Sequence, residues 1–190
     1  MRAVLFLLLL ALPLAAKESP EEILALLPEK IAGCEKGEYH RYEPAALGGS
    51  VPYGGPGLVV TVYAYDMGME NIATDLDDAV LRGTFRQAQA EIRLAMEKGD
   101  YSEVTDLNPK EKRSAFGTLV ASFRVVRTNG DLKDKPLFSE VHVFGARGHV
   151  IKFRVSGEMA REKELRKILG TLLPEIRKAL VQPKAPAKQR

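Results

Sequence analysis

Residues 114–156 decide the fold, and they read SAFGTLVASFRVVRTNGDLKDKPLFSEVHVFGARGHVIKFRVS. We predict three β-strands in this stretch, at Ala115–Arg127, Ser139–Gly145 and His149–Ser156. Side chains of a strand alternate between its two faces. The odd-numbered positions of all three strands are largely apolar: Leu119, Ala121, Phe123, Val125, Val141, Val143, Ile151, Phe153 and Val155. This shared parity predicts a half-buried antiparallel meander with one core face.

The second hairpin of the meander can be given a register. If odd positions face inward in both strands, Gly145 lies opposite His149, and residues 146–148 form a three-residue loop. Gly148 then takes the left-handed conformation that such loops need. The same register gathers five polar side chains on an outer, solvated face, where Glu140 meets Arg154 and His142 meets Lys152: Arg124, Glu140, His142, Lys152 and Arg154.

Residues 1–16 have the features of a secretory signal peptide. Arg2 is followed by an apolar run that ends in small residues, and we predict cleavage after Ala16. The alternative is a membrane anchor, but the run from Ala3 to Ala16 is shorter than the roughly 20 residues of a spanning helix. We therefore expect an exported protein, periplasmic or secreted, with no transmembrane segment after cleavage.

Composition favours one globular domain and argues against nucleic-acid binding. The chain has 190 residues, of which 45% are hydrophobic, enough for one sizeable core. We predict a single α+β domain at residues 17–181 and a disordered basic tail at residues 182–190. The formal charge of +3 leaves the body near neutral, so no nucleic-acid partner is expected.

Cys34 is the one cysteine of the chain, so the fold contains no internal disulfide. A free cysteine packs as a small hydrophobic side chain, and we predict that Cys34 is buried. The alternative is a disulfide between two chains.

The run from Leu58 to Asp66 is the most strand-like of the chain, because its two alternating faces are both largely apolar. We predict a central strand that is partly covered on both sides. Tyr63 and Tyr65 share one face, and tyrosines present apolar bodies with polar tips. They are candidate ligand-binding residues of a groove, and the alternative is that they are ordinary half-buried strand residues.

Met67 and Met69 follow this strand in a loop. Thioethers are soft ligands that select Cu(I), so the pair is a candidate metal site in an exported protein. Such a site needs a third soft or imidazole ligand, and the sequence brings none of the histidines near. The alternative is that both methionines fill gaps in the core.

Two long amphipathic helices are expected. The first begins at Thr74, which is expected to cap it, and buries a stripe through Leu81, Phe85 and Ile92. Another face of this helix carries Arg82, Arg86 and Arg93, which form either a basic docking stripe or a solvated face. The second helix begins near Glu158, and Pro174 is expected to kink or restart it.

Most enzyme signatures are missing from the sequence: it has no Gly-x-Ser-x-Gly elbow, no paired-histidine zinc motif and no Cys-x-x-Cys. His142 beside Glu140 could serve as an acid–base pair of a small hydrolase, but a solvated sheet face explains these residues without chemistry. We expect a non-enzymatic protein and no cofactor.

The order of elements is strand, Gly/Pro-rich loop, strand, long helix, antiparallel meander and closing helix, behind a signal peptide. This order resembles the PsbP/Mog1-like group of α-β-α sandwiches. The stretch Thr61–Gly68, which reads Thr-Val-Tyr-Ala-Tyr-Asp-Met-Gly, is similar to a stretch found in small exported bacterial proteins. The resemblance implies an antiparallel sheet with helices packed on its faces. It also implies a binding or accessory role, with another envelope protein or a small ligand as partner, and it carries over no catalytic residue.

Overall fold

A computed structural model describes residues 17–108 and 110–182 of the chain. The predicted signal peptide at residues 1–16 and residues 183–190 of the predicted tail lie outside this range. Within it, no helix has the length and apolar character needed to cross a membrane.

Ten strands of the described chain form one antiparallel sheet, with the order β1-β2-β4-β5-β10-β9-β8-β6 and with β3 beside β4 and β7 beside β8. The strands are β1 (Lys30–Ile31), β2 (Cys34–Lys36), β3 (His40–Arg41), β4 (Gly49–Gly55), β5 (Leu58–Tyr65), β6 (Tyr101–Asp106), β7 (Lys112–Arg113), β8 (Leu119–Arg127), β9 (Pro136–Ala146) and β10 (His149–Glu158). The helices are α1 (Pro20–Ala25), α2 (Ala79–Glu97) and α3 (Glu162–Val181), with short 3₁₀ turns η1 (Ala45–Leu47) and η2 (Met159–Arg161).

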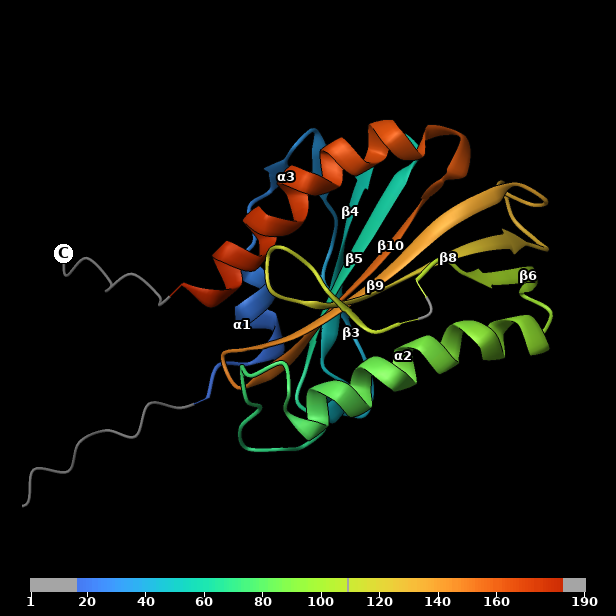
Figure 1. The fold of residues 1–190 in the computed structure, drawn as a ribbon. Coiled ribbons are helices and arrows are strands. Elements are labelled where there is room, and N and C mark those ends of the chain that lie inside the picture. The colour runs from blue at the N-terminus through green and yellow to red at the C-terminus, as the bar shows by residue number, and fades with distance from the viewer. Residues whose placement is uncertain (1–16, 109, 183–190) are drawn as a thin grey trace, which may run out of the picture.

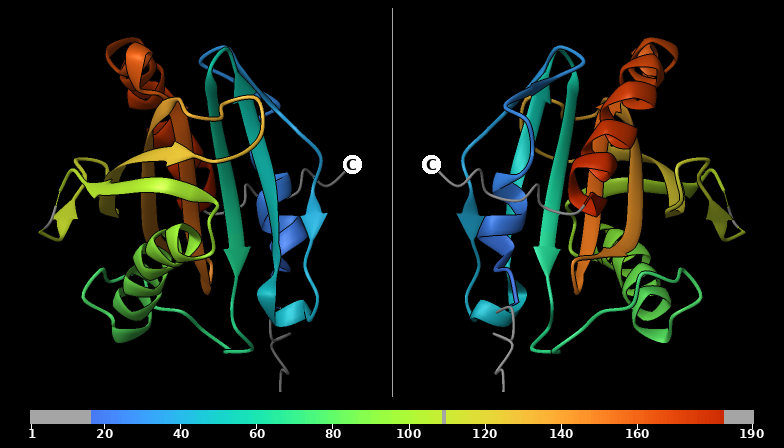
Figure 2. Two further views of the ribbon diagram at one scale, coloured as in Figure 1. Left: turned by 90° about the vertical axis from the view of Figure 1, so that its right-hand side faces the viewer. Right: turned by 90° about the vertical axis from the view of Figure 1, so that its left-hand side faces the viewer.

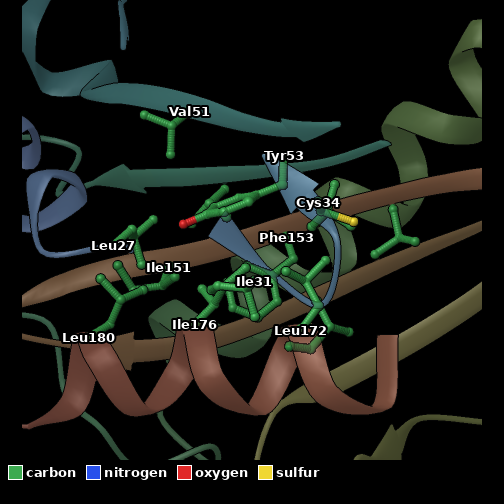
Figure 3. Packing of buried hydrophobic residues seen from close by; sticks show 14 of the residues in the cluster. Leu27, Ile31, Cys34, Val51, Tyr53, Ile151, Phe153, Leu172, Ile176 and Leu180 are labelled. Carbon is green, nitrogen blue, oxygen red and sulfur yellow. The ribbon is translucent and has the colours of Figure 1, made fainter. Parts of the chain in front are cut away.

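Helices cover both faces of the sheet, with α3 above it and α2 below it in the view of Figure 1. The first core lies between the sheet and the helices α1 and α3. There Leu172, Ile176 and Leu180 point from α3 toward Ile151 and Phe153 of β10 (Figure 3). The predicted class, a mixed α+β fold with an antiparallel sheet and helices on its faces, is thereby confirmed.

The second core lies between α2 and the opposite face of the sheet. Leu81, Phe85 and Ile92 of α2 are buried there, as their spacing predicts. The helix packs mainly on β6, β8 and β9, whereas α1 lies near β4 and β5 (Figure 2). Part of the α2 face of β5 and β10 is therefore left without a helix directly over it.

The three-strand meander is confirmed, but the predicted register of its second hairpin is wrong. His149 pairs with Ala146, and Ile151 pairs with Phe144, one residue away from the predicted alignment. The connection is a two-residue turn, in which Arg147 and Gly148 have φ values of 52° and 72°. Two consecutive left-handed residues match the right-handed twist of a hairpin, which explains why this turn forms.

The shared parity of the three strands also fails between β9 and β10. A register shift of one residue moves every side chain of a strand to the other face. Glu140 and His142 therefore lie on the α3 face, whereas Lys152 and Arg154 lie on the α2 face. Because both faces are covered, both parities of β9 are buried, and the predicted constellation of five outer charges is divided between them.

Two helix predictions are corrected. Helix α2 begins at Ala79, because the Asp78 carboxylate accepts hydrogen bonds from the backbone of Val80 and Leu81; Thr74 is not its cap. Helix α3 begins at Glu162 rather than near Glu158 and is continuous through Pro174, with buried leucines on both sides of the proline. The predicted restart is therefore wrong, whereas the predicted kink stays a prediction. Cys34 is free and 1% exposed, as predicted, and burial raises the pKa of its thiol.

Candidate functional site

A pocket of about 220 Å³ opens between α2 and the uncovered part of β5 and β10. We call it the tyrosine pocket. It is lined by Tyr42, Leu47, Tyr63, Tyr65 and Met67, by Thr84, Gln87, Ala88 and Glu91 of α2, and by Lys152 of β10. The two predicted tyrosines thus lie in one pocket, together with one of the two predicted methionines.

Strand register brings the central residues of the pocket together. Lys152 is the cross-strand partner of Tyr63, and Val150 is that of Tyr65, so these side chains share one face of the sheet. The wall opposite is a side of α2 whose residues recur at helical spacing, Thr84, Gln87, Ala88 and Glu91. Neither the strand pair nor the helix forms the pocket alone.

Lys152 is the cation of the pocket. Its Nζ atom lies 4.7 Å from the centroid of the Tyr63 ring and 5.8 Å from that of Tyr65, within the range of cation–π attraction. The side chain is 16% exposed, and this burial lowers the pKa of Lys152. The nearest carboxylate oxygen, Glu91 Oε2, is 3.8 Å away.

The tyrosines form an ordered aromatic wall. Tyr42 stacks on Tyr63 with 6.2 Å between ring centroids, and His40 packs its edge against Tyr42. Burial raises the pKa of Tyr63 and, more strongly, that of Tyr65. Both phenols therefore stay neutral at physiological pH, where they offer apolar faces and hydrogen-bonding tips.

The three predicted arginines do not line this pocket. Arg82 is paired with Asp77 at 2.8 Å and with Glu111 at 3.2 Å, and Arg93 is paired with Asp106 at 2.7 Å. Arg86 is exposed on the same side of α2. The structure thus places the stripe next to the β6 end of the sheet, away from the tyrosines, and its predicted docking role stays a prediction.

The two methionines are separated by the fold. Met67 lines the tyrosine pocket and is 38% exposed, whereas Met69 packs against the second core. The described residues contain no group of three or more His, Cys, Asp or Glu side chains that could hold a metal ion. Copper binding by Met67 and Met69 stays a prediction without a third ligand at hand.

A second, polar cavity of about 420 Å³ lies under α3, and we call it the Glu140 cavity. The Glu140 carboxylate accepts hydrogen bonds from Ser122 Oγ at 2.9 Å and from Arg166 Nη1 at 2.8 Å. It also lies 3.3 Å from His142 Nε2. The other ring nitrogen of His142 is 3.0 Å from Thr118 Oγ1. Burial opposes ionisation, but the hydrogen bonds and charges of His142 and Arg166 hold the pKa of Glu140 at about 2.

These contacts bear on the predicted acid–base pair. Glu140 and His142 are buried, at 6% and 3% exposure, and not on a solvated face as predicted. Both ring nitrogens of His142 already have partners, and a carboxyl with so low a pKa is a poor base. The polar groups of the Glu140 cavity satisfy one another, as expected of a network that fastens α3 to the sheet.

Comparisons with known proteins add little to these observations. No protein-family model matches the chain, and no curated protein matches it. Among solved structures, the chain is similar to the solution structure of cyanobacterial PsbP (CyanoP) from Synechocystis sp. PCC 6803, with 14% identity and a TM-score of 0.41. The match covers 74% of this chain and 89% of that chain. It is a loose structural resemblance, in agreement with the resemblance that the order of elements indicates.

The sequence missed several residues of the tyrosine pocket. Lys152 was placed beside His142 by the wrong register, and Tyr42, Thr84 and Glu91 come from segments distant in sequence. One signal was available: the predicted strand His149–Ser156 carries Lys152 among apolar residues, and a lysine that comes to lie beside tyrosine rings favours a cation–π contact.

Proposed function

We propose that the protein is an exported, non-enzymatic binding protein and that its ligand site is the tyrosine pocket. The observation that carries this proposal is the partly buried ammonium of Lys152, which lies over the rings of Tyr63 and Tyr65 in the lining of the pocket. A pocket with apolar walls and a few convergent polar groups is the usual form of a small-ligand site. Export is supported by the apolar run of residues 3–16.

The chemistry of the pocket favours binding over catalysis. Its titratable groups are three phenols, the Lys152 ammonium and the Glu91 carboxylate. The raised pKa values of Tyr63 and Tyr65 make these phenols weak general acids near neutral pH. The lining contains a Thr84 hydroxyl but no histidine or cysteine beside it, so no activated nucleophile is assembled among the lining residues.

The proposal can be tested with methyl NMR. The full chain is expressed with ¹³C-methyl methionine, and a diverse fragment library is titrated against it. Met67 reports on the tyrosine pocket, and Met96, exposed near the end of α2, is an internal control. We expect a subset of fragments to shift the Met67 signal and to leave Met96 unchanged.

A matched pair of variants identifies the site. Tyr63→Leu should abolish the Met67 shifts, whereas Tyr101→Leu, in a strand outside the pocket, should retain them. A library that leaves the Met67 signal unmoved throughout would show that the tyrosine pocket does not bind small ligands.

A further inference from the structure

Among the described residues, the ammonium of Lys152 makes an ion pair but no close hydrogen bond. Within the described part of the chain, its nearest charged partner is Glu91 Oε2 at 3.8 Å, beyond hydrogen-bond distance. Glu91 is also half exposed and already accepts a hydrogen bond from Gln87 Nε2 at 3.2 Å. An ammonium has three donors, so Lys152 can donate to a ligand without breaking an existing hydrogen bond.

This distinguishes the tyrosine pocket from the Glu140 cavity. In the Glu140 cavity each charged group has its partners inside the protein. In the tyrosine pocket the Lys152 ammonium is largely desolvated, and its partners are a 3.8 Å ion pair with Glu91 and two ring faces, each weaker than a charge-assisted hydrogen bond. A partly buried cation with free donors is a cost to the unliganded protein that an anionic ligand would offset.

A second positive charge lies next to Lys152 on the same face of the sheet. Arg154 lies two residues along β10 on the same face, where it pairs with Thr61 of β5. Its charge and that of Lys152 repel, which also lowers the pKa of Lys152. Lys152 and Glu91 are the two charged residues of the lining, and Arg154 beside them on β10 adds positive charge next to the pocket.

The lining and the volume of the tyrosine pocket limit the class of ligand further. Leu47 and Met67 are 50% and 38% exposed at the mouth, and the tyrosine rings form the interior wall. A volume of about 220 Å³ is below the roughly 300–1,000 Å³ of pockets for drug-sized ligands. A phosphate dianion is better matched by the bidentate fork of arginine than by one ammonium.

Building on the proposed function, we infer that the ligand is a small organic acid: a carboxylate on an aromatic or apolar body. Its carboxylate accepts hydrogen bonds from Lys152 Nζ, and its body packs against Tyr63, Tyr65 and the side chains at the mouth. Glu91 is a competing negative charge that limits the affinity.

The absence of tryptophan from the chain makes an indole ligand visible by its own fluorescence. We would titrate the full-chain protein into indole-3-acetate and, separately, into the neutral indole-3-acetamide, and follow anisotropy and the Met67 methyl signal. We expect the acid to bind about tenfold more tightly than the amide, a difference of roughly 1.4 kcal/mol. Lys152→Met should abolish this preference, so that acid and amide bind this variant with equal affinity.

Three further variants test whether the preference for the acid depends on the charge of the pocket. Lys152→Arg should keep the preference for the acid, and Glu91→Gln should increase acid affinity by about threefold. Lys167→Met, on the exposed side of α3, should leave the affinity for both ligands unchanged. If Lys152→Met does not fold, Lys152→Arg and Glu91→Gln still decide the matter.

The outcomes separate the inference from the proposed function. If acid and amide shift the Met67 signal with equal affinity, the inference of an anionic ligand is wrong, but the tyrosine pocket is still a binding site. Acid binding that survives Lys152→Met would also overturn it. Much tighter binding by a peptide that ends in the same carboxylate would show that the occupant is a protein chain and not a small acid. No response at Met67 to either indole or to the fragment library would overturn both proposals.

Discussion

Gly145 of β9 shows how closely the sheet packs on the segment before α2. A Cβ atom at this position would lie 1.9 Å from the carbonyl oxygen of Ala73, a backbone atom that cannot rotate away. We predict that Gly145→Ala lowers the free energy of unfolding by about 2–3 kcal/mol through overpacking. Gly83→Ala is the control, because the added methyl in α2 meets nothing within 4 Å. It should raise stability by roughly 0.5–1 kcal/mol, since alanine favours helix. Urea titration measures both, and equal effects would contradict the steric argument.

Arg147 has two roles in one residue. Its backbone has a φ of 52° in the β9–β10 turn, and its guanidinium donates to Leu180 O at 2.9 Å, to Glu18 Oε2 at 2.6 Å and to Gln182 O. It therefore fastens both ends of the described chain to one turn. Asparagine tolerates the left-handed region, so Arg147→Asn should keep the turn and release the ends.

We expect Arg147→Asn to increase hydrogen exchange several-fold in residues 178–182 and to leave β9 and β10 protected, because local opening costs less than global unfolding. Exchange measured by mass spectrometry would show this, with Lys167→Asn as a surface control. Unchanged exchange at the end of α3 would mean that apolar packing alone holds the helix there.

At the scale of elements, the Glu140 cavity fastens α3 to the sheet. Arg166 of α3 reaches Glu140 of β9, while its Nε atom donates to Glu162 at 2.7 Å. Glu140→Gln keeps the shape but removes the charge that three donors address, and we predict a loss of about 1–3 kcal/mol. Lys30→Met, which breaks the exposed pair with Glu35 at 2.9 Å, should cost less, because exposed ion pairs contribute little to stability. Denaturant midpoints compare the two, and a smaller loss for Glu140→Gln would contradict a structural role for the network.

Much of the element order could be predicted from the sequence, because it depends on local periodicity. The meander strands, the buried stripe of α2 and the tyrosine-bearing β5 all follow from spacing. The register of β9 and β10 does not, since the two-residue turn at Arg147 needs a left-handed arginine that no spacing predicts. That one-residue error moved Lys152 to the face of His142 and hid its contact with Tyr63.

The candidate site was predictable only in part for the same reason. Tyr63 and Tyr65 could be selected because they lie two residues apart on one strand. Thr84 and Glu91 could not, because their contact with the tyrosines depends on where α2 crosses the sheet, which is a property of tertiary packing and not of local sequence.

At the scale of the whole molecule, the two cores on opposite faces of the sheet are covered by helices to different extents. The first core is closed by α1 and α3, whereas α2 lies mainly over β6, β8 and β9 and leaves the α2 face of β5 open. The tyrosine pocket lies at this incomplete edge. A pocket at the limit of a helix layer can exchange ligand without opening the core, as the proposed binding function requires.

Stability of the whole molecule should fall on acidification, and two buried groups set the pH range. His149 is 1% exposed; its Nδ1 atom lies 2.8 Å from Arg147 O, and its Nε2 atom has no hydrogen-bond partner among the described residues. Burial lowers the pKa of His149 below its ordinary 6.5, so the unfolded chain takes up this proton first. The stability from neutral His149 is therefore present above about pH 6.5 and is lost below it.

Glu140 acts in a lower range with the same sign. Its pKa of about 2 lies below the ordinary 4.5, so its contribution is complete above pH 4.5 and is lost as the pH falls toward 2. We predict urea midpoints that decrease from pH 7 to 5 and again from pH 4.5 to 3. His149→Gln should flatten the first decrease, and Glu140→Gln should flatten the second. A midpoint that rises between pH 7 and 5 would mean that protonated His149 pairs with Asp66 Oδ2, 3.8 Å from its Nε2 atom, strongly enough to outweigh the cost of burying its charge.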